Sequence, residues 1–154
     1  MKRAFFYKTP IGEVGFAERD GFITDLFFPG RTSLEEHKIE ETPVIKQAHT
    51  QLVEYFDKKR TEFNIPFFLE GTDFEKSVWN ALLEIPYGEI RTYKQIATRL
   101  GKPNACRAVG RANGQNPISI MFPCHRVIGT NGTLTGYGGG LPAKKYLLEM
   151  EGAL

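Results

Sequence analysis

The sequence predicts an α+β protein, with a small N-terminal α/β lobe of antiparallel strands and a mostly helical C-terminal domain that contains a helix-turn-helix. Three observations lead to this prediction. The N-terminal part of the sequence contains short apolar runs separated by turn residues, and segments with helix-capping signals follow it along the chain. The two halves of the chain also carry opposite net charge. We place the domains at residues 1–71 and 72–154, the first structural and the second carrying the chemistry.

Composition narrows the class of protein. The chain has 154 residues, of which 41% are hydrophobic, and this is enough for a buried core. Two cysteines are too few for a disulfide framework, which favours a reducing compartment. The N-terminus lacks a secretory signal, and no apolar stretch has the length of a membrane span. We therefore expect a cytoplasmic protein, monomeric and without membrane contact.

The N-terminal half begins with three predicted strands, "RAFFYKT", "GEVGFAE" and "FITDLFF". The pair Asp20-Gly21 between the last two is a strong hairpin signal. The polar segment 33–42 is expected to be a loop or a short helix. Thr42 then caps a helix with Pro43 at its first position. The apolar stripe of that helix is Ile45, Ala48, Leu52 and Phe56, and residues 58–72 leave it as extended chain.

The C-terminal half begins with a helix opened by a capping box, Thr72 with Glu75, and stopped by Pro86. A second capping box, Thr92 with Gln95, opens another helix that ends at Gly101. Asn104 is expected to cap a third helix, "ACRAVGRAN". Two short helices joined by a tight turn are typical of a helix-turn-helix.

Charge indicates what this pair of helices could bind. Residues 1–70 carry ten Lys or Arg against twelve Asp or Glu, whereas residues 71–154 carry ten against six. No acidic residue lies between Glu89 and Glu149. A basic segment of this kind suits a polyanion, although it is equally compatible with a solvated basic surface.

The third helix is slim, since Ala and Gly recur along it, and Arg107 and Arg111 share one side. It could approach either a neighbouring helix or a DNA groove.

The stretch "FPCHRV" raises the question of catalysis, because Cys124 and His125 are adjacent. Their spacing to Cys106 fits no zinc pattern, and a lone cysteine is often buried and inert. A nearby imidazole would activate the thiol, but adjacent residues of an extended strand face opposite ways. His125 therefore needs a bend, which Pro123 could supply, or a bridging water. Glu149 or Glu151, on the last helix, could orient the imidazole.

Several motifs together resemble one family. "PCHRV", with "RAVG" and "NP" upstream and "GYGGG…K…LL…EG" downstream, closely resembles the O6-alkylguanine-DNA alkyltransferases. The resemblance is dense over residues 72–152 and loose in the N-terminal lobe. It implies that Cys124 accepts an alkyl group from O6 of guanine and that His125 is a water-mediated base. It also implies that Glu151 orients His125 and that Asn116 braces the active-site turn.

The resemblance also implies the contacts to the substrate, which is double-stranded DNA containing alkylated guanine. Arg107 would fill the stack after the base is flipped, and Tyr93 would hydrogen-bond the flipped guanine. Tyr137 and Gly138 would form the pocket wall, Gly138 standing where some members have serine. Lys144 falls at a basic position near that loop. Other expected DNA contacts are Ala105, Arg111 and Arg126.

The reaction implied by the resemblance is a single transfer, because a thioether has no easy hydrolytic exit. No cofactor and no metal are expected, and whether O4 of thymine is also a substrate stays open. Two alternatives belong to other classes. One is a damage-binding protein that flips the base without transfer, which the presence of Cys124 disfavours. The other is a cysteine hydrolase using Cys124, His125 and Glu151, which would leave the basic helix-turn-helix unexplained.

Overall fold

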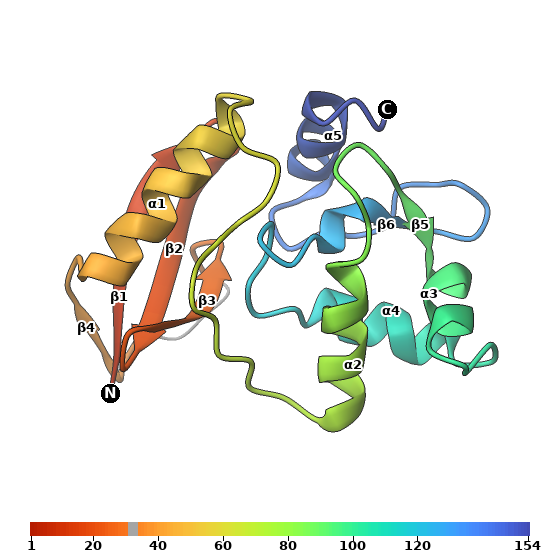
Figure 1. Cartoon of the computed structure of the whole chain (residues 1–154), viewed down its shortest axis with the longest axis horizontal. Coiled ribbons are helices and arrows are strands. Elements are labelled where there is room, and N and C mark those ends of the chain that lie inside the picture. Colours follow the sequence, from red (N-terminus) through yellow and green to blue (C-terminus); the bar gives the residue numbers. More distant parts are fainter. Residues whose placement is uncertain (31–33) are drawn as a thin grey trace. The chain divides into compact units, whose positions relative to one another are not determined.

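The computed structural model describes residues 1–30 and 34–154. The chain forms two compact units, Met1–Leu69 and Glu70–Leu154, which are described separately below. Figure 1 shows that the first unit contains the main sheet and one helix, and that the second is mostly helical. The predicted α+β class, with an N-terminal sheet lobe and a helical C-terminal part, is confirmed.

The first unit is built on a four-stranded sheet in the order β3-β2-β1-β4. Strands β1 (Lys2–Thr9), β2 (Gly12–Arg19) and β3 (Phe22–Phe27) form the antiparallel part, as the three apolar runs predicted. The turn between β2 and β3 places Asp20 at φ 54° and Gly21 at φ 84°. Both values lie in the left-handed region that Asp-Gly turns favour, so the predicted hairpin is confirmed.

Strand β4 (His37–Ile39) corrects the prediction for residues 33–42. This segment was expected to be a loop or a short helix, but its middle pairs in parallel with β1 at Lys2–Ala4. Ser33, at its start, lies outside the described residues. Three residues give too little hydrophobic alternation to predict a strand, and the pairing partner is more than thirty residues away in sequence.

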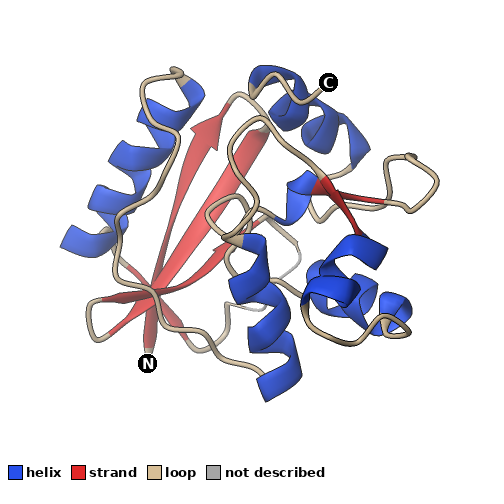
Figure 2. Ribbon diagram, turned by 45° about the vertical axis from the view of Figure 1, so that its right-hand side comes forward, coloured by secondary structure: helices blue, strands red, loops and turns tan. Residues whose placement is uncertain are grey.

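Helix α1 (Pro43–Phe56) begins as predicted, because the Thr42 side chain accepts a hydrogen bond from the backbone N–H of Ile45. Figure 2 shows α1 running along one face of the sheet. Its buried residues include Ile45, Ala48 and Leu52, and Tyr55 is more deeply buried than Phe56. Residues 65–68 continue as extended chain, and Phe67 bridges to Ile23 of β3.

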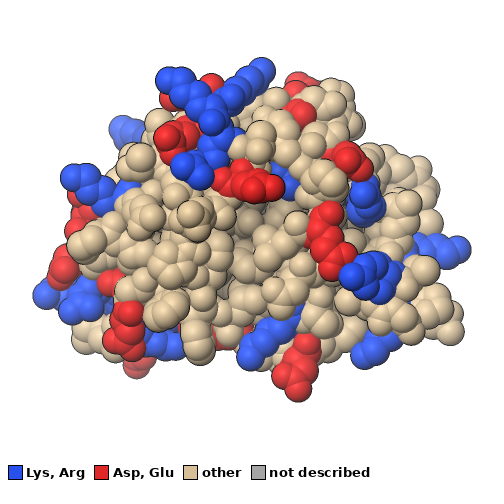
Figure 3. Space-filling model, in the orientation of Figure 1, with Lys and Arg blue, Asp and Glu red and all other residues tan. Residues whose placement is uncertain are grey.

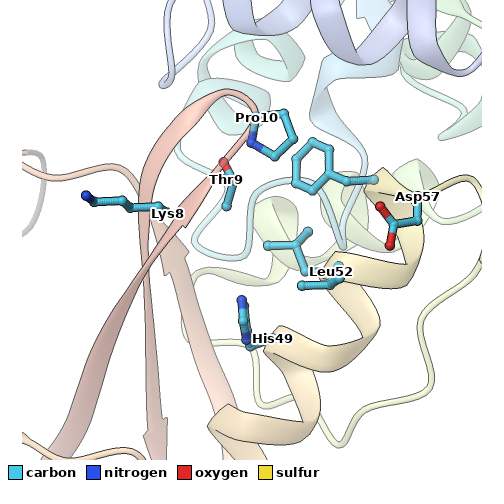
Figure 4. A pocket seen from close by; sticks show the side chains of 8 residues that line it. Lys8, Thr9, Pro10, His49, Leu52 and Asp57 are labelled. Carbon is cyan, nitrogen blue, oxygen red and sulfur yellow. The ribbon is translucent and has the colours of Figure 1, made fainter.

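A cavity of about 100 Å³ lies between the β1–β2 turn and α1 (Figure 4). Its walls are mostly apolar, with the polar side chains of Lys8, His49 and Asp57 at its edge. None of the residues predicted for catalysis or DNA binding lines it. This cavity is therefore not part of the predicted site.

The second unit starts with α2 (Asp73–Leu82), whose capping box between Thr72 and Glu75 is present on both sides as predicted. The helix ends before Pro86, and tighter turns lead up to the proline. Helix α3 (Tyr93–Arg99) has the second predicted capping box, and Gly101 follows it at φ 73°. The remaining elements are α4 (Cys106–Gly114), the short 3₁₀ helix η1 (Cys124–Arg126) and α5 (Leu141–Met150).

Two features of this unit were not predicted. Strands β5 (Arg91–Thr92) and β6 (Val127–Ile128) form a short parallel pair, which holds the start of α3 beside the residues that follow η1. Helix α4 has no side-chain cap, so the prediction that Asn104 caps it is wrong. Its N-cap is Ala105, whose own backbone N–H bonds to Lys102 in a preceding turn. Trp79 joins α2 to α4 by donating to the carbonyl of Ala112 at 2.8 Å.

Candidate active site

Cys124 lies in a bend of the chain. Pro123 precedes the 3₁₀ helix η1, and the Arg126 N–H closes this turn on the Pro123 carbonyl at 3.0 Å. The bend expected at Pro123 is thus present, and Cys124 and His125 do not alternate across a strand. Both are buried, Cys124 being 5% exposed and His125 0%. The thiol is therefore held inside the second unit rather than on its surface.

Two asparagine side chains hold this turn, Asn113 in the last turn of α4 and Asn116 two residues after the helix. Asn116 donates to the Phe122 carbonyl at 2.7 Å and accepts from the Ile118 N–H at 3.0 Å. Asn113 donates to the carbonyl of Cys124 itself at 3.4 Å. Asn113 was not predicted as a site residue. The signal available in the sequence was a polar residue four positions after the apolar Val109 on a helix of small residues.

His125 lies against a buried carboxylate. Its Nε2 is 2.8 Å from Oε2 of Glu151, the residue that directly follows α5. Glu149, the alternative considered from sequence, is exposed and pairs with Lys145. Because Glu151 occupies Nε2, that nitrogen carries the proton of a neutral imidazole. Nδ1 is buried and has no hydrogen-bond partner among the described residues, so it is the nitrogen that can accept a proton.

Arg126, which was predicted to contact DNA, does not face outward in this structure. Its guanidinium donates to Glu151 through Nε at 2.8 Å and Nη2 at 3.1 Å, and to the Ile85 carbonyl through Nη1 at 2.8 Å. The whole residue is 6% exposed. The fork of a guanidinium fits a carboxylate in this way, and a buried carboxylate requires such a partner. Arg126 therefore holds Glu151 in place.

The electrostatics favour a protonated thiol beside a neutral base. Burial raises the pKa of Cys124, opposed by hydrogen bonding with Asn116 and by the positive charge of Lys144. Burial lowers the pKa of His125, although Glu151 acts in the opposite direction. Burial alone would raise the pKa of Glu151, but its hydrogen bonds with His125 and Arg126 outweigh this and lower it to about 2. Glu151 is consequently ionised at any ordinary pH.

Lys144, in the first turn of α5, was predicted as a basic residue that contacts DNA, but it is buried in this structure. Its Nζ donates to the carbonyls of Val127 at 2.7 Å and Thr135 at 3.3 Å, and the residue is 0% exposed. The hydroxyl of Thr135 in turn bonds to the hydroxyl of Tyr93. The loop before α5 thus links a buried lysine to a tyrosine predicted to touch the substrate.

The loop that contains Tyr137 and Gly138 lies partly buried beside the site. The Tyr137 ring meets His125 edge to face, with ring centroids 6.5 Å apart. Burial raises the pKa of Tyr137, and the neighbouring charge of Cys124 adds to this. The phenol is therefore neutral and forms a wall next to the reactive pair.

The predicted helix-turn-helix consists of α3 and α4. Arg107 and Arg111 are exposed on α4, whereas Val109 and Ala112 face the core of the unit. Gly110 leaves room for Tyr93, whose ring would lie 3.8 Å from a Cβ at that position. Ala105 is half-buried at the start of α4. Figure 3 shows several separate Lys and Arg side chains on the side where Figure 1 draws α3, and others elsewhere on the same face. The arrangement offers a basic, slim surface to a partner.

Two further observations concern metals and membranes. Within residues 1–30 and 34–154, no three His, Cys, Asp or Glu side chains come together in a way that could hold a metal ion. None of the helices in this described part has the length and apolar character needed to cross a bilayer.

Comparison with known proteins identifies the family. Residues 73–153 match the family "6-O-methylguanine DNA methyltransferase, DNA binding domain", and residues 3–69 match "6-O-methylguanine DNA methyltransferase, ribonuclease-like domain". The chain belongs to the 6-O-methylguanine DNA methyltransferase family. The match over 73–153 contains every residue that we predicted for the site.

Relatives within this methyltransferase family cover nearly the whole chain. The methylated-DNA–protein-cysteine methyltransferase of Methanosarcina acetivorans is 47% identical over 150 residues, which are 96% of each chain. The constitutive enzyme of Bacillus subtilis is 45% identical over 153 residues, covering 94% of this chain and 92% of its own. Among solved structures, Mycobacterium tuberculosis OGT in complex with DNA superimposes with a TM-score of 0.92. It is 46% identical, and the match covers 98% of this chain and 93% of that one.

Proposed function

We propose that the protein repairs DNA directly by moving an alkyl group from O6 of guanine to its own Cys124, once per molecule. The observation that carries the proposal is the buried series Cys124, His125 and Glu151, in a chain that belongs to the methyltransferase family. The relatives named above are methylated-DNA–protein-cysteine methyltransferases, and the OGT structure contains DNA. Both findings support this activity for the present chain.

The proton of the thiol is the first requirement of the reaction. Because Cys124 is protonated at rest, we propose that Nδ1 of His125 takes its proton through a bridging water. Glu151 fixes the tautomer of His125 and stabilises the imidazolium that forms. The histidine then returns the proton toward the leaving guanine.

The sulfur of Cys124 forms a bond to the alkyl carbon while the bond from that carbon to guanine O6 breaks. The electron pair of the broken bond stays on guanine, which takes up the proton that left the thiol. The products are an S-alkylcysteine and an unmodified guanine. The thioether is stable to water, so the protein acts stoichiometrically, and the reaction requires neither metal nor cofactor.

The target atom is inaccessible within a duplex, so the base must leave the stack at a cost of a few kcal/mol. We propose that α4 docks in the minor groove and that Arg107 fills the space left by the base. Tyr93 would hydrogen-bond the flipped guanine, and Tyr137 with Gly138 would line its pocket. Arg111 and the backbone at Ala105 would contact the DNA backbone, which supports binding with little dependence on sequence.

A protein with this function would act as a monomer in the cytoplasm, where bacterial and archaeal DNA is accessible. The chemistry at Cys124 applies equally to an alkyl group on O4 of thymine, so duplexes carrying either lesion belong in the test.

The experiment is an intact-mass measurement after mixing the protein with excess duplex that contains one O6-methylguanine. The wild-type protein is expected to gain one methyl group and stop. Cys124→Ser is expected to gain none, while Cys106→Ser, which changes the other, half-buried cysteine, should behave as wild type. Binding without a gain in mass would refute transfer and favour a damage-binding protein. Release of many product equivalents per protein would instead indicate a hydrolase.

A further inference from the structure

Lys144 is a buried cation without an acidic partner. Its side chain is fully inaccessible, and its ammonium donates only to neutral oxygens, those of Val127 and Thr135. Among residues 1–30 and 34–154, no carboxylate lies within ion-pair distance of it. A buried charge is costly unless an opposite charge balances it. The fold therefore buries an ammonium, and any group that balances its charge must be one of its neighbours.

The surrounding titratable groups come from four segments. Tyr93 of α3 reaches this region through the hydrogen bond between its hydroxyl and that of Thr135, which also accepts from Lys144. Cys124, His125 and Arg126 lie on η1, which directly precedes Val127, and Tyr137 lies on the loop two residues beyond Thr135. Glu151 follows α5 itself, but its carboxylate is already engaged by Arg126 and His125. Tyr137 is a neutral phenol, since burial raises its pKa. Among these groups, the thiol of Cys124 is the one that the proposed transfer makes negative.

We propose that the Lys144 ammonium is the counter-charge of the Cys124 thiolate, present when the sulfur becomes nucleophilic and left unbalanced once the sulfur is alkylated. This inference rests on the proposed alkyl-acceptor role of Cys124. It makes Lys144 a positioning residue that acts through electrostatics, in place of the DNA contact predicted from sequence. The mutual effect is visible in both groups: Lys144 opposes the rise in the pKa of Cys124, and Cys124 opposes the fall in the pKa of Lys144.

The charge changes follow directly from the transfer. Before it, the thiol proton has left and the negative sulfur faces the positive ammonium. Afterwards the sulfur is a neutral thioether, the electron pair has moved to guanine, and Lys144 keeps a positive charge that only carbonyl and hydroxyl oxygens solvate. Alkylation thus favours loss of the Lys144 proton or opening of the pocket. The used protein is expected to be less stable than the unused one for an electrostatic reason.

The test is the pH dependence of Cys124 alkylation by iodoacetamide, which requires no DNA. Intact mass follows the rate between pH 6 and 10 in a Cys106→Ser background, so that Cys124 is the only thiol. In Lys144→Met the profile is expected to shift upward by about one pH unit, so that the rate below the pKa falls about tenfold. The plateau rate at high pH should stay unchanged, whereas a packing defect would alter the plateau. Lys145→Met removes a neighbouring exposed lysine and should leave the profile in place.

The pH profile and the methyl transfer from DNA test the counter-charge role and the proposed function separately. A profile in Lys144→Met within about 0.3 pH units of the parent overturns the counter-charge role. If that variant does not fold, Lys144→Gln, whose amide can still donate to Val127, is measured by the same criterion. Failure of the proposed function would show as no methyl gain from DNA, which the iodoacetamide profile does not affect. As a second readout, methylation should lower the urea midpoint of the parent more than that of Lys144→Met. An equal decrease in both would contradict the electrostatic cause.

Discussion

Replacement of Glu151 by Gln tests whether the buried ion pair organises the site. The substitution keeps the shape of the side chain but removes the charge that faces Arg126 at 2.8 and 3.1 Å. Arg126 would stay buried with the carbonyl of Ile85 as its remaining strong acceptor. Breaking such a pair costs about 3–5 kcal/mol. The pKa of Glu151, lowered from 4.5 to about 2, corresponds to about 3 kcal/mol. Both values are large beside a typical unfolding free energy of about 5–15 kcal/mol.

Urea denaturation of four proteins measures this cost: wild type, Glu151→Gln, Arg126→Met and the double variant. Glu151→Gln is expected to lose about 3 kcal/mol. The double variant is expected to be less destabilised than the sum of the singles, because removing both charges leaves none unpaired. Glu149→Gln, which changes an exposed glutamate two residues earlier, should change stability by no more than about 0.5 kcal/mol.

The ion pair does not organise the site if Glu151→Gln lowers the free energy of unfolding by less than about 1 kcal/mol. The same conclusion follows if the losses of the two single variants add up to that of the double variant. The double variant has a further use. It should recover stability but transfer methyl groups slowly, because His125 no longer has a carboxylate to hold its tautomer. Full transfer by the double variant would mean that Glu151 serves the fold alone.

Other predictions concern pH and the helices. Below pH 4.5 the free energy of unfolding should fall as pH drops toward 2, since the unfolded chain takes up the Glu151 proton more readily than the folded chain. Urea midpoints at pH 6 and 3 check this, and the decrease should be smaller in Glu151→Gln. Thr72→Ala removes a capping box and should cost about 1 kcal/mol by the same assay, whereas Thr72→Ser should cost little. Trp79→Phe removes the 2.8 Å donor of the Ala112 carbonyl, which keeps the Gln115 N–H at 3.1 Å, so a loss of about 1 kcal/mol is expected on denaturation. Gly101→Ala places a Cβ at φ 73° and should lower the thermal midpoint by the equivalent of about 1–2 kcal/mol.

Features decided within a few residues could be predicted from the sequence. The capping boxes at Thr72 and Thr92 depend on contacts three residues apart, and the Asp20-Gly21 hairpin depends on two left-handed residues. Features decided by distant pairing could not be. Strand β4, in the middle of the first unit's sequence, pairs with residues near its start, and β5 pairs with β6 across the whole of α3 and α4.

The same distinction applies to the site. The bend at Pro123 is local, and the sequence offered it as one of two alternatives beside a bridging water. The burial of Arg126 and Lys144 was not, because nothing in a sequence shows that a basic side chain will meet a carboxylate 25 residues later or a carbonyl 17 residues earlier. Both residues were therefore assigned to DNA, the usual partner of basic side chains in such a segment. Their positions inside the unit move them from recognition to the support of the reactive pair.

The amides of Asn113, in the last turn of α4, and Asn116, just after it, have a consequence for the single use of the protein. They bond the segment carrying the nucleophile to the helix proposed to meet DNA, so neither can shift without the other. An enzyme with many turnovers must repeatedly open to exchange product for substrate. A protein that reacts once has no such cycle, and it needs to admit substrate to its thiol only a single time. Rigidity that would slow a true catalyst is therefore no disadvantage to a single-use reagent.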